Sequence, residues 1–182
     1  AFTVQTIDLE DNRKPRHIYT VPITGGTPRR ITEAGNLNDR PRWSPDGKRL
    51  AFISDRGGSA QVWLMNPDGA GARQVTNLST EAGGVLYSPD GKNLLFTSEV
   101  YSDCPDEACN QKRLEAEKTT KVKARSYTRL LYRHWDRWQG PRRSHLFVVP
   151  VEGGAPKDLT PGDRDVPLFS LGGGDDYAIS PD

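Results

Sequence analysis

Short apolar runs separated by turn residues recur along the chain. The stretches RLAFI at 49–53 and NLLFT at 93–97 are apolar at successive positions, and so are QVWLM at 61–65 and HLFVV at 145–149. Strands that are apolar on both faces are typical of strands sandwiched between two layers. The turn sequence NPDG at 66–69 leads into a short polar stretch that suits a protected edge strand. The pattern predicts an all-β chain of short strands.

Two elements repeat along the chain with the same spacing. The sequences WSPDGKRLAF and YSPDGKNLLF place Ser44 and Ser88 44 residues apart. A second element, HIYTVPITGGTPRRIT from His17, returns as QVWLMNPDGAGARQVT from Gln61, again 44 residues later. A third copy, HLFVVPVEGGAPKDLT, starts at His145 after one further period and an insertion of about 40 residues. A period of about 40–45 residues with four strands per repeat is typical of β-propeller blades.

The repeats divide the chain into blades of four antiparallel strands. Residues 1–35 form a partial blade that lacks its innermost strand, and residues 36–79 form a complete blade. Residues 80–161 form a second blade, interrupted by an insertion at 103–143 between its second and third strands. Residues 162–182 begin the next blade. A closed propeller has more blades than this, so we interpret the chain as a fragment of one β-propeller domain. The fragment could be a recombinant piece of that domain or a proteolytic product of a longer protein.

Two consequences follow from this division. A small β-sandwich with incidental repeats is the alternative fold, and it is disfavoured because two independent elements keep one spacing. An open partial propeller also leaves strand edges unpaired, so we expect the fragment to self-associate through its open blade edges.

Charge is distributed unevenly although the formal net charge is only +1. Residues 110–143 contain eleven Lys or Arg residues and three Asp or Glu residues, so the rest of the chain has an acidic excess. The stretch NQKRLEAEKTTKVKAR at 110–125 lacks Gly and Pro and predicts an exposed helix or arm. Two roles of this arm stay open: it could be a solvated arm that lies on an acidic propeller, or it could bind a peptide or a protein partner.

The segment YRHWDRW at 132–138 combines aromatic and basic residues, which could stack nucleic-acid bases, but no nucleic-acid-binding module surrounds it. We therefore expect no nucleic-acid partner.

Cys104 and Cys109, in CPDEAC, are the only cysteines. Structural zinc sites use about four ligands in paired spacings, which the three scattered histidines do not complete. Redox-active pairs usually have two intervening residues rather than four. A local disulfide at the start of the arm is favoured over two free thiols, and it implies an oxidising compartment, periplasmic or extracellular.

Motifs for catalysis or cofactor binding are missing. The sequence has no G-x-S-x-G elbow, phosphate loop, dinucleotide fingerprint or H-E-x-x-H. His17 and His145 occupy the same position of a third strand, which predicts a structural role. No apolar run is long enough to cross a bilayer. The acidic loop residues match no calcium-binding loop; they are Asp163, Asp165, Asp175 and Asp176. We expect the fragment itself to catalyse nothing, and we expect no cofactor, metal or membrane partner.

The repeat sequences resemble a known family. PRWSPDGKRLAFISDR at 41–56 resembles the repeats of TolB-type propellers, which also occur in the N-terminal propeller of prolyl oligopeptidase family serine peptidases. SYTRLLYRHWDRWQGPRRSHLFVVPVEGG at 126–154 resembles bacterial dipeptidyl and acylaminoacyl peptidases, in which a charged arm, often opened by a Cys pair, leads to an R-H-W-D-x-W segment. The resemblance implies a seven- or eight-bladed propeller that gates peptide access to an α/β-hydrolase domain. The catalytic Ser, Asp and His would lie in that domain, C-terminal to this chain.

The resemblance also implies substrate-binding residues in the arm. Dipeptidyl peptidase IV-like relatives hold the substrate amino terminus with two adjacent acidic residues, whereas this arm offers Glu115 and Glu117 with one residue between them. Arg133 and Asp136 are candidates for gating or substrate contact, since a guanidinium can pair with a peptide carboxylate or carbonyl, and Trp135 lies between them.

Two alternatives stand beside these assignments. Arg133 and Asp136 could pair with each other at i and i+3, while Trp135 and Trp138 pack the arm onto its blade. The whole chain could also be a TolB-type scaffold propeller that binds protein partners and serves no peptidase.

Overall fold

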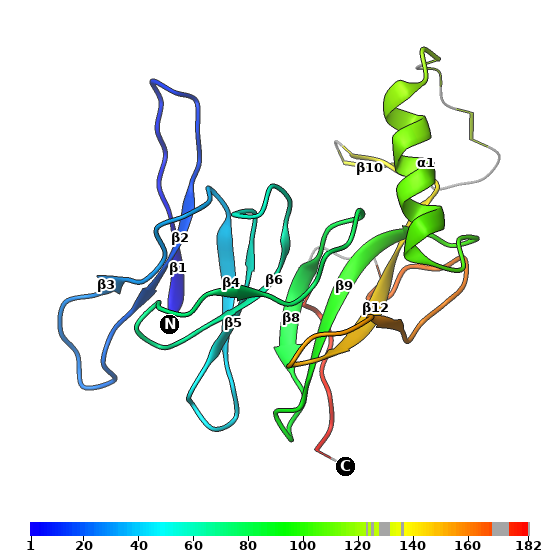
Figure 1. Ribbon diagram of the computed structural model, residues 1–182. Helices are drawn as coiled ribbons and strands as arrows, with labels where there is room; N and C mark the ends of the chain where they lie inside the picture. Colours follow the sequence, from blue (N-terminus) through cyan, green and yellow to red (C-terminus); the bar gives the residue numbers. More distant parts are fainter. Residues whose placement is uncertain (123, 125, 128–131, 136, 169–174, 182) are drawn as a thin grey trace.

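Three antiparallel sheets stand side by side in the computed structural model, which describes residues 1–122, 124, 126–127, 132–135, 137–168 and 175–181 (Figure 1). The first sheet has three strands, β1 (Phe2–Gln5), β2 (Arg16–Thr20) and β3 (Arg29–Arg30). The second has four in chain order, β4 (Asn38–Trp43), β5 (Leu50–Ser54), β6 (Gln61–Met65) and β7 (Arg73–Gln74). The third has β8 (Gly83–Tyr87), β9 (Asn93–Tyr101), β12 (Arg142–Pro150) and β13 (Lys157–Asp158), also in chain order. The predicted all-β class and the open, unclosed propeller-like arrangement are confirmed.

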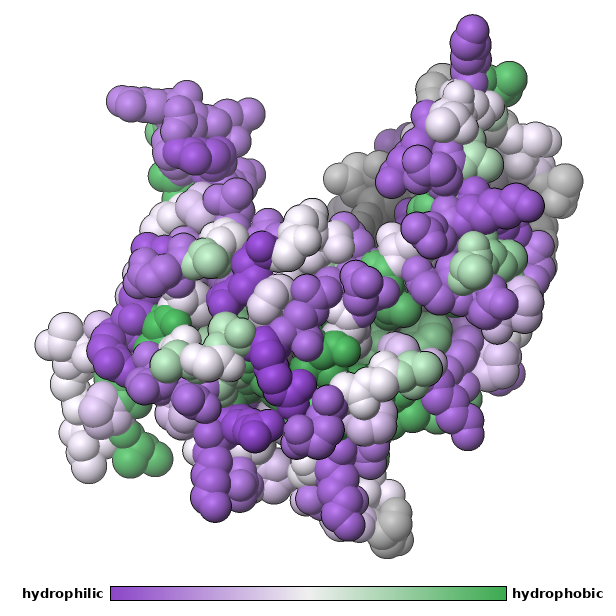
Figure 2. Space-filling model, viewed as in Figure 1, coloured by the Kyte–Doolittle hydropathy of each residue, from purple (hydrophilic) through white to green (hydrophobic). Residues whose placement is uncertain are grey.

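The arm interrupts the third sheet between β9 and β12. It contains the helix α1 (Glu107–Thr119) and a small hairpin of β10 (Arg133–His134) and β11 (Arg137–Trp138). The arm and the β1–β2 loop project from the same side of the sheets (Figure 1). Figure 2 shows polar surface on both projections and a recess between them. No helix in the described ranges meets the length and apolarity that a membrane span requires.

The core lies between neighbouring sheets, which explains the consecutive apolar residues. Every residue of β5 is buried. Leu50 and Phe52 pack toward the first sheet with Ile18, while Ala51 and Ile53 pack toward the third sheet. Because successive side chains of a strand point to opposite faces, a strand covered on both faces is apolar at successive positions, here from Leu50 to Ile53, and the buried Ser54 at its end bonds Asn38. Loss of the Phe52 ring would cost about 3–5 kcal/mol of stability.

The SPDG sequences form hydrogen-bonded turns. The Gly47 N–H donates to the Ser44 carbonyl at 2.9 Å, and Gly47 takes a φ of 70°, which favours glycine. The Ser44 hydroxyl donates to Asp46 Oδ1 at 2.6 Å and accepts from the Arg49 N–H. Asp46 also accepts from the Lys48 N–H. The second turn repeats each bond at Ser88, Asp90, Gly91, Lys92 and Asn93. The Ser, Asp and Gly of the motif therefore each have a structural reason.

A threonine fastens the outermost strand of each sheet. These outer strands are only two residues long, so ladder bonds alone hold them weakly. In each sheet a backbone N–H of the strand beside the outer one donates to a threonine hydroxyl just beyond the outer strand, at 2.9 Å in all three cases. The pairs are Ile18 with Thr32, Val62 with Thr76, and Leu146 with Thr160.

The two repeat histidines have partners inside the fold. His145 is 2% exposed, and its ring nitrogens lie 2.6 Å from Asp158 Oδ2 and 2.8 Å from the Gly162 carbonyl. His17 contacts the guanidinium of Arg30. The equivalent Gln61 bonds in the same direction, toward the segment that follows the outer strand. In all three sheets, the side chain at this position therefore links its strand to the outer strand or to the segment that follows the outer strand.

The segment at 175–181 has no assigned strand, whereas the sequence predicts the first strand of a further blade there. Asp175 and Tyr177 in this segment contact the sheets through their side chains. Tyr177 Oη donates to the carbonyls of Gly84 and Leu95 at 3.2 and 2.9 Å. The segment is therefore held against β8 and β9 of the third sheet.

Candidate functional site

The base of the arm is a closed, well-bonded turn. Cys104 and Cys109 form a disulfide. Asp106 caps α1, accepting from the Cys109 N–H at 2.8 Å. Asn110 is buried, and its side chain accepts from the Tyr101 N–H at 2.9 Å and donates to the Asp106 carbonyl. The disulfide thus encloses the turn in which α1 begins, directly after β9.

Further contacts hold α1 to the sheets. Glu107 accepts from the Ser79 N–H at 2.6 Å, which joins the helix to the connection between β7 and β8. The Arg113 guanidinium lies 4.1 Å from the centre of the Tyr101 ring and pairs with Asp103. Burial, and next the Glu117 carboxylate, raise the pKa of Tyr101 to about 12. The first three turns of α1 are therefore fixed to the propeller.

Glu115 and Glu117 do not form a joint site. Residues two apart on a helix do not face each other. Glu117 influences Tyr101 at the sheet, whereas Glu115 is exposed and lies 3.9 Å from Lys118. The arm therefore does not bring its two helical carboxylates together to hold a single amino group.

An aromatic cluster fills the far part of the arm. Tyr127, Tyr132 and Trp138 lie with ring centres 5.7–6.2 Å apart. The Arg133 guanidinium lies 5.5 Å from the centre of the Trp138 ring, and Arg133 Nε donates to the Trp135 carbonyl at 2.7 Å. Stacked aromatic rings with a cation on one face form a surface that can receive apolar and carbonyl groups of a peptide.

Trp135 stands out at the turn between β10 and β11. It has a positive φ of 48° and its side chain is 74% exposed. A bulky residue seldom takes this backbone conformation. The alternative in which Trp135 packs the arm onto the blade is therefore wrong. Trp138 packs within the arm, against Tyr127 and Tyr132. Asp136 lies outside the described residues, so its pairing with Arg133 stays a prediction.

Sequence reasoning missed an ion-pair cluster on β4. Arg40 and Arg42 both bond the carboxylate of Asp175, 135 and 133 residues further along. The sequence assigned Asp175 to a loose acidic loop and did not single out either arginine. The repeat contains a signal for this cluster. At the 44-residue spacing Arg40 aligns with Gly84, so an arginine stands where the next repeat has a glycine.

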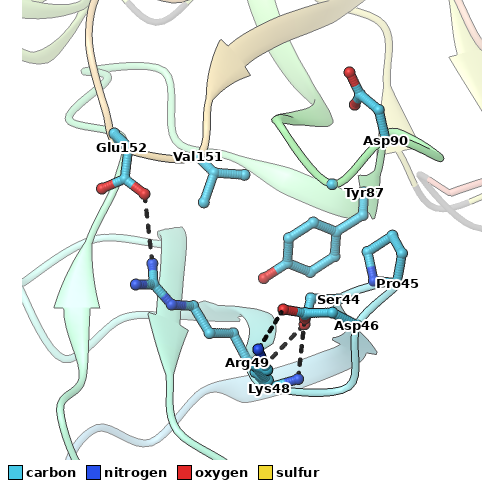
Figure 3. Close-up of a pocket in the computed structure, with 10 residues that line it drawn as sticks. Ser44, Pro45, Asp46, Lys48, Arg49, Tyr87, Asp90, Val151 and Glu152 are labelled. Carbon is cyan, nitrogen blue, oxygen red and sulfur yellow. Dashed lines mark hydrogen bonds and ion pairs between the residues drawn. The ribbon is translucent and has the colours of Figure 1, made fainter.

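A small cavity lies on the opposite side of the sheets from the arm, at the SPDG turns (Figure 3). It has a volume of about 350 Å³ and is bordered by both turns, Tyr87, Val151 and Glu152. Burial raises the pKa of Tyr87 to about 12, so its hydroxyl is neutral. Arg49 lies 3.7 Å from Glu152. Asp46 and Asp90 accept hydrogen bonds within their own turns. Across the part of the chain that the structure describes, no group of three or more metal-ligating side chains occurs.

Comparison with known proteins agrees with this architecture. The TolB beta propeller domain (PD40) family matches residues 5–125, which is more than half of the chain. This chain belongs to the TolB β-propeller family. The match includes the second sheet, β2 and β3 of the first, the SPDG turns and the helix of the arm. The resemblance seen in the repeat sequences is thereby confirmed.

Relatives of this TolB-type propeller include peptidases. Dipeptidyl-peptidase 5 of Porphyromonas endodontalis is 32% identical over 188 residues, which cover the whole of this chain and 26% of the relative. The acylaminoacyl peptidase of Pyrococcus horikoshii superposes with a TM-score of 0.60 at 18% identity, over 86% of this chain and 23% of that one. TolB from Acinetobacter baumannii gives a TM-score of 0.50 at 17% identity, over 90% of this chain and 31% of that one. The two structural likenesses concern the fold alone. The chain spans about a quarter of the length of its curated peptidase relative.

Proposed function

We propose that this chain is the non-catalytic propeller part of a serine exopeptidase of the dipeptidyl or acylaminoacyl type, and that it gates peptide access to a hydrolase domain. The observation that carries the proposal is the match to dipeptidyl-peptidase 5 across the whole chain, arm included. This relative is a peptidase, and its match covers the arm as well as the blades.

The arm supplies the substrate contacts in this proposal. Arg133 and Trp135 lie in the hairpin that carries the aromatic cluster, and Asp136 follows Trp135 in the sequence. The exposed indole of Trp135 offers an apolar face, and the Arg133 guanidinium offers donors for a peptide carbonyl or carboxylate. Glu115 and Glu117 take a smaller part, since they do not converge. The recess between the arm and the β1–β2 loop is the proposed entry path (Figure 2).

The compartment is proposed from the arm as well. The Cys104–Cys109 disulfide is compatible with an oxidising environment, and such bonds are rare in the cytosol. We place the protein in the periplasm or outside the cell.

The deciding experiment is labelling of the full-length protein with a serine-hydrolase activity probe, followed by mapping of the labelled residue. A covalent adduct on a serine C-terminal to residue 182 supports the peptidase function. A folded protein that takes no label refutes it. A parallel assay with dipeptidyl and N-acyl chromogenic substrates then separates the two exopeptidase types.

A scaffold propeller that binds protein partners is the second candidate. The structural likeness to TolB favours it, since that likeness extends over 90% of this chain. The two candidates differ in the sequence that follows this segment in the full-length protein. A G-x-S-x-G elbow beyond the last blade indicates a peptidase, and a chain that ends with the propeller indicates a scaffold.

A further inference from the structure

Two arginines of β4 converge on one distant carboxylate. Arg42 Nη2 lies 2.5 Å from Asp175 Oδ2, and the Arg40 guanidinium bonds the other oxygen, Oδ1. The Asp175 side chain is 20% exposed, and those of Arg40 and Arg42 are 33% and 37% exposed. A carboxylate that receives one guanidinium on each oxygen is held by charge-assisted hydrogen bonds, which are among the strongest in proteins.

Both guanidinium groups of this cluster share the Asp175 carboxylate. Asp39, the acidic residue next to Arg40 on β4, is paired with Arg16 at 2.6 Å. If Asp175 swings away, two neighbouring cations lose their common partner and present donors suited to the two oxygens of another carboxylate.

The backbone of β4 holds Arg40 in an unusual conformation. β4 has a bulge between Asp39 and Arg42, and Arg40 within it has a φ of 55°. One repeat later, β8 has the same bulge between Gly83 and Val85, and the aligned Gly84 has a φ of 44°. The repeat therefore requires a left-handed residue at this position, which glycine supplies without strain. In β4 the position bears a long cationic side chain instead, as expected where strain serves a binding role.

The segment that starts at Asp175 also contacts β8. Tyr177 Oη donates to the Gly84 carbonyl, which places this segment against β8. The segment therefore contacts β4 through Asp175 and β8 through Tyr177, which are the first strands of two successive sheets. In a propeller these strands surround the central channel.

We propose that Arg40 and Arg42 form a carboxylate-binding site, which Asp175 occupies in this structure and which the C-terminal carboxylate of a peptide occupies in its place. The choice of a peptide as ligand rests on the proposed function, whereas the carboxylate chemistry rests on the two arginines alone. Asp175 acts as an internal competitor, so the apparent affinity for a ligand is reduced by the fraction of molecules in which Asp175 stays bound.

Isothermal titration calorimetry of the full-length protein, treated first with the serine-hydrolase activity probe so that no ligand is hydrolysed, tests this site with two ligands, N-acetyl-alanyl-alanine as the free acid and as its C-terminal amide. Asp175→Asn removes the competing charge, and we expect it to raise the affinity for the acid about tenfold or more while the amide is unaffected. The double variant Arg40→Gln, Arg42→Gln abolishes the preference for the acid. Arg49→Gln is the matched control, since Arg49 pairs with Glu152 outside the cluster, and it keeps the preference.

The proposal is overturned if every folded form binds the acid and the amide equally, or if none binds either ligand. The two arginines would then have only the structural role of holding Asp175 in place. If Asp175→Asn does not fold, Arg42→Lys decides. It keeps the charge but loses the planar pair of donors, so acid binding weakens and amide binding does not. The activity probe tests the proposed peptidase function, and calorimetry tests the carboxylate site. Either proposal can therefore be refuted without the other.

Discussion

Glu107, in the first turn of α1, accepts a hydrogen bond from the backbone N–H of Ser79 at 2.6 Å. Ser79 lies on the connection from the second sheet to the third, so this bond links the arm to the junction of two blades. Together with the disulfide, it fixes the direction in which α1 leaves the propeller.

Glu107→Ala will loosen the arm. The substitution removes a charged acceptor and leaves a partly buried N–H unpaired, at a cost of about 1–3 kcal/mol. We expect faster hydrogen exchange at the amides of α1 and at Ser79, measured by mass spectrometry, with β5 and β6 unchanged. Glu115→Ala is the control, since Glu115 is exposed on the same helix. Equal exchange in both variants would show that the Ser79 bond does not anchor the arm.

Reduction of the Cys104–Cys109 disulfide will destabilise the start of α1. The loop that it closes is short, with a sequence separation of 5, and chain-entropy estimates give about 2 kcal/mol for a loop of this size. We expect partial loss of helical circular dichroism with the sheets intact, and the same loss in Cys104→Ser, Cys109→Ser. Intact mass with and without reductant reports the state of the bond. An unchanged spectrum after complete reduction would mean that the cap and Asn110 suffice.

Thr76→Val will destabilise the second sheet. The change keeps the shape of the side chain but leaves the buried Val62 N–H without its hydroxyl acceptor, at a cost of about 1–3 kcal/mol. Thermal denaturation should show a lower midpoint. Thr76→Ser retains the hydroxyl and should lose much less. If the serine variant is as unstable as the valine variant, the methyl group rather than the hydrogen bond matters at this position.

Stability will fall in mild acid through His17. Burial, and next the Arg30 cation, lower the pKa of His17 below its ordinary 6.5, with Glu33 opposing them. The unfolded chain therefore binds a proton at a higher pH than the folded chain does, so stability decreases as the pH drops below 6.5 toward the folded pKa. His17→Gln should flatten this part of the profile, measured as denaturation midpoints from pH 7.5 to 5. An identical slope in the variant would assign the effect to other groups.

The 182-residue chain, produced by itself, will self-associate. An open row of blades leaves strand edges with free hydrogen-bonding groups, which pair readily with another chain. Light scattering should give a mass that rises with protein concentration. A constant monomer mass at high concentration would contradict this expectation.

The sequence by itself determined the blades. Their period, the consecutive apolar residues of β5 and the SPDG turns all depend on local chemistry repeated at fixed spacing, because a two-sided strand and a tight turn restrict residue types independently of the rest of the fold. The sequence also placed the arm between the second and third strands of its blade, since the interruption shifts the spacing of the repeat.

Only the tertiary structure decided which side chains meet. Asp175 bonds Arg40, 135 residues earlier in the chain. Glu107 accepts a hydrogen bond from Ser79, although the sequence predicts only an exposed helix or arm in this region. Glu115 and Glu117, close in sequence, point apart on α1. Such contacts depend on how one blade is placed against the next and on a bulge that puts Arg40 in a left-handed conformation. No local pattern of residues encodes these relations, because each depends on backbone positions set by distant strands.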